Sequence, residues 1–390
     1  MAKVLVAFFN AMQVPEDPNA MPIFYEAFVQ GLDRAGNEVA VFSHSLFGQD
    51  FGEIDYDTKQ AITAFHPDIC FIFNNSFYDL SEIVDCPIVI YEVDSPRYFS
   101  NKENIKRNPE RYLYFVVQQE SVKTLMQEYN VLEEQIFCVP FFTEIYADDS
   151  FVQTTNISFI GSMFADNCCG VMQYFLNQAP SIEERQMMRR CLQELKVNPQ
   201  ITPTELVYRC QITSEKVARC LDLKQLLMIL SGERRIALLA SLEELGLDLY
   251  GTNGWGSKYY YNTALNLVYN DKQVYSIKHN QDIYNASKIG ISVSHYQAVS
   301  GFPWRVMDVM ASNACLVSDY HSDFKDLFGN VPVPIYSSDR EAYDICKQLL
   351  EDESRRRDIV LQCQDVINAK YRFKHLLPKL EEYSGVVMHT

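Results

Sequence analysis

The 390-residue chain lacks several features that would place it in a class at once. It has no run of about eighteen apolar residues, so nothing in it is expected to span a bilayer. The N-terminal "KVLVAFF" is short and no small-x-small cleavage site follows it cleanly, which favours a first strand over a signal peptide. A basic surface is missing too, because the net charge is -17, and this argues against nucleic acid as the main partner.

Paired cysteine motifs are also missing. The eleven cysteines are scattered, often inside apolar runs, and no C-x-x-C pair occurs among them. This usage is typical of reduced thiols in a cytoplasmic protein. Only Cys168 and Cys169 are neighbours, and a zinc site built from them and a distant histidine is the less favoured alternative.

Residues 1–150 alternate short apolar runs with amphipathic stretches, which predicts a parallel sheet covered by helices on both faces. Strands are expected in "KVLVAFFN", "EVAVFSH", "DICFIFNN", "CPIVIYEVD", "YLYFVVQQ" and "QIFCVPFF", with helices at 23–32 and 120–129. In such sheets ligands bind at the carboxyl ends of the strands. The polar residues expected at those ends are Asn10, Asn74, Asn75, Asp94 and Ser95.

Residues 151–370 are predicted to form a second lobe of the same kind, with strands in "NISFIGS", "LDLYG", "KIGISVSH" and "ACLVSD". The stretch from about 170 to 245 is charged and nearly free of glycine, and it is interpreted as a helical insertion. A helix-turn-helix is disfavoured there because its surroundings are not strongly basic. Residues 371–390 should form a helix, for which a return to the first lobe is one option. The cleft between the two lobes is the expected binding site.

The segment 300–320, "SGFPWRVMDVMASNACLVSDY", places an unusual polar pair on an otherwise apolar helix. Pro303 is expected at its first position, with free N–H groups and a positive dipole end facing the cleft. Arg305 suits phosphate oxygens, and Asp308, one turn further, suits a sugar diol. The pair therefore describes a nucleotide site, while an ordinary i, i+3 ion pair is the alternative that spacing alone does not exclude.

The same segment is similar to a specific signature of the GT-B glycosyltransferases of the group-1 type. Further segments extend the resemblance over nearly the whole chain, and within that group it points to the CgeB-like (spore-maturation-protein-like) branch. The segments include "CPIVIYEVDSPRYF", "ERRIALLASLEELGLDLYG", "IYNASKIGISVS" and "YRFKHLL". Two positions depart from the family: members commonly carry Glu where this chain has Asp308, and Ser300 stands where the wider group has a second glutamate.

The resemblance implies a GT-B fold, in which two Rossmann-like doubly wound lobes face a cleft. The second lobe would hold a nucleotide-sugar donor and the first an acceptor. The implied donor-binding residues are Gly161, Ser162, Tyr250, Gly251, Tyr284, Lys288, Ser300, Gly301, Arg305 and Asp308, and the acceptor-binding residues are Asn10, Asn74 and Asn75. For Lys288 a solvated lysine ahead of a strand is the alternative.

Glycosyl transfer must stabilise a departing nucleoside phosphate and, with inversion, needs a base for the acceptor proton. Many glycosyltransferases hold a metal ion with a D-x-D motif, and the run considered for that role here, the adjacent Asp148 and Asp149, is interpreted as loop carboxylates. We therefore expect no metal or other cofactor, with Arg305 stabilising the leaving group. Asp94 is the first candidate for the base, ahead of His295 and His279, and a retaining outcome without such a base stays open.

The resemblance thus predicts a bacterial, metal-independent glycosyltransferase, as in the biosynthesis of cell-surface polysaccharide, with a glycan, lipid-linked or protein acceptor. It is expected in the cytoplasm, with the inner face of the membrane as an alternative place through peripheral association. Dimerisation through the helical insertion stays open. Two other functions compete: a nucleotide-sugar epimerase of GT-B fold, and a non-catalytic scaffold that binds a nucleotide sugar or glycan.

Overall fold

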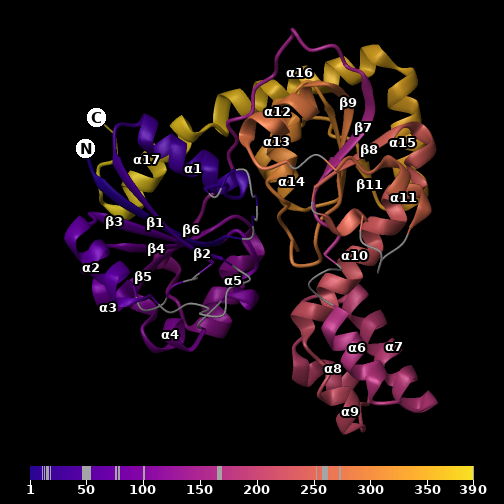
Figure 1. Cartoon of the computed structure of the whole chain (residues 1–390), viewed down its shortest axis with the longest axis horizontal. Coiled ribbons are helices and arrows are strands. Elements are labelled where there is room, and N and C mark those ends of the chain that lie inside the picture. The colour runs from indigo at the N-terminus through magenta and orange to yellow at the C-terminus, as the bar shows by residue number, and fades with distance from the viewer. Residues whose placement is uncertain are drawn as a thin grey trace.

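The computed structural model contains two α/β lobes and a helical arm that projects from the second lobe (Figure 1). It describes the chain except residues 11, 13, 15, 16, 18, 46–53, 75, 76, 78, 79, 100, 101, 165–168, 252, 257–261, 272, 273 and 390. No helix in the described part of the chain combines the length and the apolar composition that crossing a bilayer requires.

The first lobe is built on a six-stranded parallel sheet in the order β2-β1-β3-β4-β5-β6. All six predicted strands are present: β1 (Lys3–Asn10), β2 (Glu38–Ser45), β3 (Ile69–Phe73), β4 (Ile88–Tyr91), β5 (Tyr112–Val116) and β6 (Ile136–Cys138). Its helices are α1 (Ile23–Arg34), α2 (Tyr56–Phe65), α3 (Leu80–Ile83), α4 (Lys102–Arg107) and α5 (Gln119–Tyr129), with short 3-10 turns at Pro96–Tyr98, Pro109–Arg111 and Glu133–Gln135.

Strand β1 shows why these strands are continuous apolar runs. Val4 and Val6 pack into a core shared with α1, whereas Leu5 and Ala7 pack into a separate core on the other face. Because successive side chains of a strand point to opposite faces, a sheet covered on both faces needs apolar residues at every position.

The second sheet has five parallel strands in the order β11-β10-β9-β7-β8. They are β7 (Thr155–Ile160), β8 (Leu247–Tyr250), β9 (Ser287–Ser292), β10 (Cys315–Asp319) and β11 (Ile335–Tyr336). The helices outside the arm are α11 (Thr263–Val268), α12 (Ile277–Asn285), α13 (Arg305–Ala311), α14 (Asp323–Phe328), α15 (Asp339–Glu351), α16 (Glu353–Lys370) and α17 (Phe373–Ser384), with 3-10 turns at Glu243–Leu245 and Asn253–Gly256. Both sheets are doubly wound, so the predicted fold class is confirmed.

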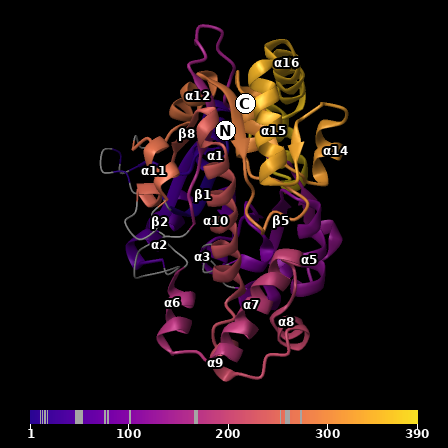
Figure 2. The same ribbon diagram turned by 90° about the vertical axis from the view of Figure 1, so that its right-hand side faces the viewer.

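The arm consists of α6 (Cys169–Asn177), α7 (Ile182–Val197), α8 (Pro203–Arg209), α9 (Glu215–Ala218) and the start of α10 (Leu223–Ser241). It has an apolar core of its own, to which Met188, Leu206 and Leu226 contribute. Figure 2 shows that α10 runs from this arm into the second lobe. The arm therefore occupies the part of the chain that the sequence marks as a helical insertion.

Helix α17 lies against the first lobe, so the chain ends beside its beginning (Figure 1). The ring of Phe373 fills the space above Gly31 of α1, where an added Cβ would lie 2.4 Å from it. Tyr383 stacks on Phe137 of β6 with ring centroids 4.0 Å apart. Aromatic packing of this kind is worth about 0.5–1.5 kcal/mol beyond the buried area.

Candidate functional site

A cavity of about 250 Å³ lies between the carboxyl ends of the two sheets. From the first lobe it takes residues that follow β4 and β5, and from the second it takes residues that follow β7 and β9 together with the start of α13 and one residue of α10. The lining residues are Val93, Asp94, Ser95, Val117, Gln118, Gly161, Ser162, Phe164, Arg235, His295, Gln297, Ala298, Phe302, Pro303, Trp304 and Arg305. In the second sheet the order reverses between β7 and β9, which is where doubly wound sheets bind ligands.

Arg305 is held firmly at the wall of this cavity. Its Nε donates to the carbonyl of Ile160 at 2.7 Å, and its guanidinium lies over the Phe159 ring, 4.5 Å from the centroid. A Cβ on Gly161 would lie 2.5 Å from Nη2, so the glycine makes room for the guanidinium. The buried Nη1 has no hydrogen-bond partner in the structure. A buried donor without a partner is unfavourable, and a ligand that reached it would relieve this.

Arg235 of α10 is a second cation of the site, and it was not predicted from the sequence. Its Nε and Nη2 donate to the carbonyl of Val293 at 3.2 and 3.0 Å, and Nη1 donates to that of Ser162 at 2.7 Å. The guanidinium lies 4.0 Å from the Phe164 centroid. Burial, and next the charge of Arg305, lower the pKa of Arg235 well below its usual range.

These two guanidinium groups meet at one cavity without an acidic partner among the residues that the structure describes. Asp319, whose charge acts on Arg235, forms its ion pair with Arg234 instead, at 3.1 Å. Buried charge without a counterion is unfavourable, and a bound anion would relieve it. The lining is therefore suited to a phosphate or diphosphate.

The start of α13 differs from the prediction. The helix begins at Arg305 rather than at Pro303, and two of its first amides are already used. Val306 N–H donates to the carbonyl of Pro303 at 3.0 Å, and Met307 N–H to that of Trp304 at 2.9 Å. A tight first turn pairs the amides that a helix start otherwise leaves free. Two amides of the expected helix end are therefore paired within the turn, and the arginine side chains supply positive charge to the site.

Asp94 is the one carboxylate among the described residues that line the cavity. Its Oδ2 accepts from Nδ2 of Asn74 at 2.9 Å, and its Oδ1 accepts from the side chain of Gln297, which belongs to the other lobe. Asn74 has a φ of 55°, and its Oδ1 accepts from the amides of Val93 and Asp94 at 2.9 and 3.1 Å. Burial raises the pKa of Asp94, which brings it toward the range of a general base.

His295 also lines the cavity, but its chemistry differs from that of a base. Its Nδ1 accepts from the backbone N–H of Gln297 at 2.9 Å. Burial, and next Arg235, lower the pKa of His295 to about 3, so the ring is neutral at pH 7. A neutral imidazole whose Nδ1 accepts carries its proton on Nε2. His295 is therefore a hydrogen-bond donor toward Phe164 and the cavity, while His279 lies outside the lining.

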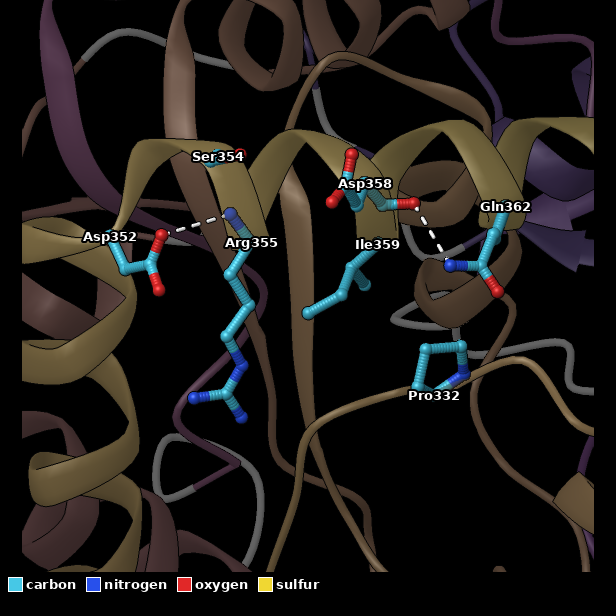
Figure 3. Close-up of a pocket in the computed structure, with 7 residues that line it drawn as sticks. All are labelled: Pro332, Asp352, Ser354, Arg355, Asp358, Ile359 and Gln362. Carbon is cyan, nitrogen blue, oxygen red and sulfur yellow. Dashed lines mark hydrogen bonds between the residues drawn. The ribbon is translucent and has the colours of Figure 1, made fainter.

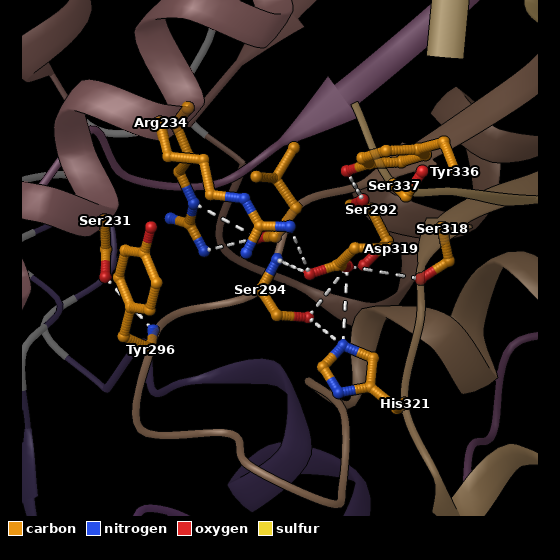
Figure 4. A network of polar contacts seen from close by, with 12 residues as sticks. Ser231, Arg234, Ser292, Ser294, Tyr296, Ser318, Asp319, His321, Tyr336 and Ser337 are labelled. Carbon is orange, nitrogen blue, oxygen red and sulfur yellow. Dashed lines mark hydrogen bonds and ion pairs between the residues drawn. The ribbon is translucent and has the colours of Figure 1, made fainter. Parts of the chain in front are cut away.

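A buried polar network holds the loop that carries His295 (Figure 4). The hydroxyl of Ser294 donates to Asp319 Oδ1 at 3.0 Å and lies 2.7 Å from Nε2 of His321. The same Nε2 is 3.4 Å from Asp319, so serine and carboxylate approach one nitrogen. A nucleophilic triad needs them on opposite nitrogens, and this cluster is therefore a support for the loop.

Asp308 faces away from the cavity, and it forms no ion pair with Arg305. Its Oδ1 accepts from the Thr143 hydroxyl in the segment between the lobes, at 2.7 Å. It lines a separate space of about 10 Å³, which has no room for a ribose. Burial raises the pKa of Asp308 to about 6, and hydrogen bonding by Thr143 opposes this. Tyr284 is buried beside it, and Arg305 acts on both side chains.

The other predicted donor residues divide into two groups. Gly161 and Ser162 line the cavity, and Gly251, with a φ of 134°, packs so closely that a Cβ would lie 2.1 Å from the Gly161 carbonyl oxygen. Tyr250 ends β8 next to this contact but does not line the cavity. Lys288 lies at the opposite, amino end of β9, where its Nζ donates to Asn156 at 2.8 Å.

Ser300 and Gly301 connect the two lobes. The Ser300 hydroxyl accepts from the amide of Glu120 at 3.1 Å and donates to Asp323 at 3.1 Å. Gly301 approaches Gln118 so closely that an added Cβ would lie 2.5 Å from its Cβ.

Of the two predicted acceptor residues that the structure describes, Asn10 and Asn74, it is Asn74 that reaches the site, through Asp94. Asn10 stabilises the loop after β1, where its Nδ2 donates to the carbonyl of Ala20 at 2.8 Å. Asn75 and Cys168 lie outside the described residues, as does the side chain of Cys169. In the described part of the chain no three His, Cys, Asp or Glu residues gather closely enough to hold a metal ion. A more open hollow runs along α16 (Figure 3), distant from the residues above.

Comparison with solved structures identifies the architecture. T4 phage BGT, as a mutant in complex with UDP-glucose, superposes with a TM-score of 0.53 at 11% identity, covering 98% of this chain and 100% of that chain. HepE of Anabaena in complex with UDP and glucose gives 0.52 at 11% identity, covering 98% and 99%. Sucrose-phosphate synthase from Thermosynechococcus elongatus gives 0.54 at 10% identity, covering 98% of each chain. At such identities the likeness shows the fold, which is GT-B.

The second lobe also matches a sequence family. Residues 234–382 match the model of a family described as glycosyl transferase-like. The matched range begins at Arg234, and it contains Arg235, His295, Gln297 and Arg305 of the cavity. A comparison with curated protein sequences finds no match. Because the matched range is less than half of the chain, it shows what this part of the second lobe is similar to, and the CgeB-like branch stays a prediction.

Proposed function

We propose that the chain is a metal-independent glycosyltransferase that uses a nucleotide-activated sugar. One observation carries this proposal: Arg235 and Arg305, without a carboxylate partner in the described part of the chain, converge on a cavity between the lobes. Its position at the reversal of the second sheet supports a nucleotide there. The glycosyl transferase-like match over 234–382 supports the same assignment.

In the proposed reaction, the bond between the anomeric carbon of the sugar and the nucleoside diphosphate breaks, and the bonding pair leaves with the phosphate oxygen. Arg235 and Arg305 would stabilise the negative charge that grows on this leaving group. Because they are fixed by backbone carbonyls and aromatic rings, they need little reorganisation during the reaction. Removing one such preorganised group typically lowers the rate about 10²–10³-fold.

Asp94 would act as the base of an inverting reaction. The acceptor oxygen bonds to the anomeric carbon while its proton passes to a free lone pair of the Asp94 carboxylate. Asp94 and the arginines belong to different lobes, which leaves space for the sugar between base and leaving group. The neutral His295 would donate its Nε2–H to a donor oxygen in the same cavity.

The acceptor we propose is a glycan, a lipid-linked glycan or a protein side chain. A uridine diphosphate sugar is the first donor to test, because BGT and HepE, which share the fold, are seen with UDP-glucose and with UDP and glucose. Contact of Asp308 with a ribose stays a prediction, and it would require the space of about 10 Å³ beside the carboxylate to enlarge.

Thermal-shift titrations with UDP, GDP, ADP and inorganic pyrophosphate test the donor site, each with EDTA and with MgCl2. We expect one nucleoside diphosphate to raise the melting temperature equally in both conditions. At a concentration of 100 Kd a ligand stabilises by about 2.7 kcal/mol, which is easily measured. No shift with any nucleotide would refute the proposal, and a shift seen only with MgCl2 would refute metal independence. Binding without release of UDP from UDP-glucose would instead favour the non-catalytic scaffold.

A further inference from the structure

The segment 297–301 of the second lobe is bonded directly to the start of α5 in the first. Oε1 of Gln118 accepts from the amides of Val299 at 3.0 Å and Gly301 at 3.4 Å. The amide of Glu120 donates to the Ser300 hydroxyl at 3.1 Å. The bonds lie at the edge of the cavity, so the relative position of the lobes is fixed where the reaction is proposed to occur.

The side chain of Gln118 is in turn bonded to the buried carboxyl group of Glu92. Its Nε2 donates to Glu92 Oε1 at 3.4 Å, and the same oxygen accepts from the Ser121 hydroxyl at 2.8 Å. Burial raises the pKa of Glu92 to about 8 against the effect of these donors. The carboxyl group is therefore mostly neutral at pH 7 and serves as a rigid anchor for Gln118.

Gln297 is fixed at three points within this contact. Its backbone N–H donates to Nδ1 of His295 at 2.9 Å, and its carbonyl accepts from Nε2 of Gln118 at 3.5 Å. Its side-chain Nε2 then crosses the cavity edge and donates to Oδ1 of Asp94. Within the first lobe the Asp94 carboxylate has the Asn74 amide as its donor, so the second donor comes from the other lobe.

We propose that Gln297 is a positioning residue, which orients the Asp94 carboxylate and favours its charged form only when the two lobes are closed. The inference rests on the proposed function, in which Asp94 accepts the proton of the acceptor hydroxyl. An amide that donates to a carboxylate stabilises its ionised state and fixes which lone pairs stay free for that proton. Closing of the two lobes would therefore orient the Asp94 base at the same time as it completes the donor site.

Asp94 also interacts with other ionisable groups, and these contribute to its titration in the wild type and in the variants. Lys224 of α10 favours its ionised form, while Glu92 and the buried Tyr25 of α1 are the acidic groups that Asp94 influences. Burial is the largest effect on Asp94 and raises its pKa, and the bond from Gln297 is the largest opposing effect. Loss of that bond should therefore be visible in the titration of Asp94.

The test is a ¹³C NMR titration of protein labelled at the aspartate carboxyl carbons, with UDP bound and the Asp94 signal assigned from Asp94→Asn. In Gln297→Ala the pKa of Asp94 should rise by roughly one to two units, since a hydrogen bond to a charged group contributes about that much. The control is Gln364→Ala, which removes a bond to the Ser312 carbonyl in the same lobe and should leave the titration unchanged. An Asp94 pKa equal in Gln297→Ala and the wild type would overturn the inference.

The kinetic counterpart is UDP release from UDP-glucose with water as acceptor. The acidic limb of the kcat profile should move to higher pH in Gln297→Ala, while KM stays within about threefold because the arginines are untouched. An unmoved limb in an active Gln297→Ala variant contradicts the inference and leaves the proposed function intact. Failure of the wild type to bind UDP or any other nucleotide contradicts the proposed function itself.

Discussion

Replacing Arg305 by alanine should remove a large part of the affinity for a nucleoside diphosphate and leave the fold intact. Within the protein the side chain donates from Nε to the carbonyl of Ile160, lies over the Phe159 ring and interacts with Tyr284. Loss of the bond to the Ile160 carbonyl costs about 1.5–3 kcal/mol of folding free energy, because its donor is charged. The buried Nη1 has no hydrogen-bond partner among the described residues, so its removal breaks no bond in that part of the chain.

The expected loss of affinity follows from that free donor. A hydrogen bond from a charged group to a phosphate oxygen contributes about 1.5–3 kcal/mol, which corresponds to a roughly 10–150-fold increase in Kd. Lysine at this position keeps the charge without the planar pair of donors, so Arg305→Lys should recover only part of the affinity.

Isothermal titration calorimetry with UDP, or with whichever nucleotide stabilises the wild type, measures both variants. Arg340→Ala is the matched control, because the Arg340 side chain is exposed on α15 and pairs with Asp344. It should bind like the wild type. An unchanged Kd in Arg305→Ala, with a melting temperature near that of the wild type, would show that the phosphates bind elsewhere.

Three further predictions concern groups around the site. Asp308→Asn should stabilise the protein by up to roughly 3 kcal/mol above pH 6 and have little effect at pH 4, because the raised pKa of Asp308 makes the wild type lose stability as pH rises from about 4 to 6. Chemical unfolding across this pH range measures the difference, and a difference that does not depend on pH would contradict the prediction. Gly301→Ala places a Cβ 2.5 Å from the Cβ of Gln118 and should move the two lobes apart, which X-ray scattering would measure as a larger radius of gyration. The control Gly170→Ala, whose Cβ would lie 3.8 Å from its nearest neighbour, should leave the radius of gyration unchanged. The His295 ring nitrogens should show an Nε2–H tautomer that does not titrate between pH 5 and 8, since its pKa is lowered to about 3, and a titration near pH 6.5 in ¹⁵N spectra would contradict this.

The strands could be predicted because burial on both faces leaves a direct mark on the sequence. In β1, Val4 and Leu5 face different cores, and a continuous apolar run is the only pattern that satisfies both. The arm is marked in a similar way by its caps, of which the Ser181–Glu184 capping box at the start of α7 is one. Local chemistry of this kind needs no knowledge of distant contacts.

Arg235 shows why part of the site could not be found in this way. On its helix Arg235 stands between Arg234 and an apolar stretch. Arg234 is partly exposed and paired with Asp319, and the sequence does not show which of the two arginines is buried. Only the three-dimensional fold brings Arg235 to the carbonyls of Ser162 and Val293, far from it in sequence. Gln297, which donates to Asp94 from the other lobe, could not be predicted for the same reason.

Asp308 shows the converse case, in which a sound pattern leads to a different place. Asp308 lies three positions after Arg305, which puts their Cα atoms on one side of the helix. However, the Arg305 side chain turns toward the Ile160 carbonyl and the cavity, while Asp308 reaches the Thr143 hydroxyl between the lobes. The spacing in the sequence fixes where the Cα atoms lie on the helix, whereas the packing around each side chain determines which group it contacts.

A crystal structure of the protein with bound UDP would test the central claim most directly. We expect diphosphate oxygens within about 2.7–3.2 Å of Arg305 Nη1 and next to the Arg235 guanidinium, in the cavity that also contains Asp94. UDP bound away from both arginines, or a diphosphate held by a metal ion on carboxylates instead, would contradict it.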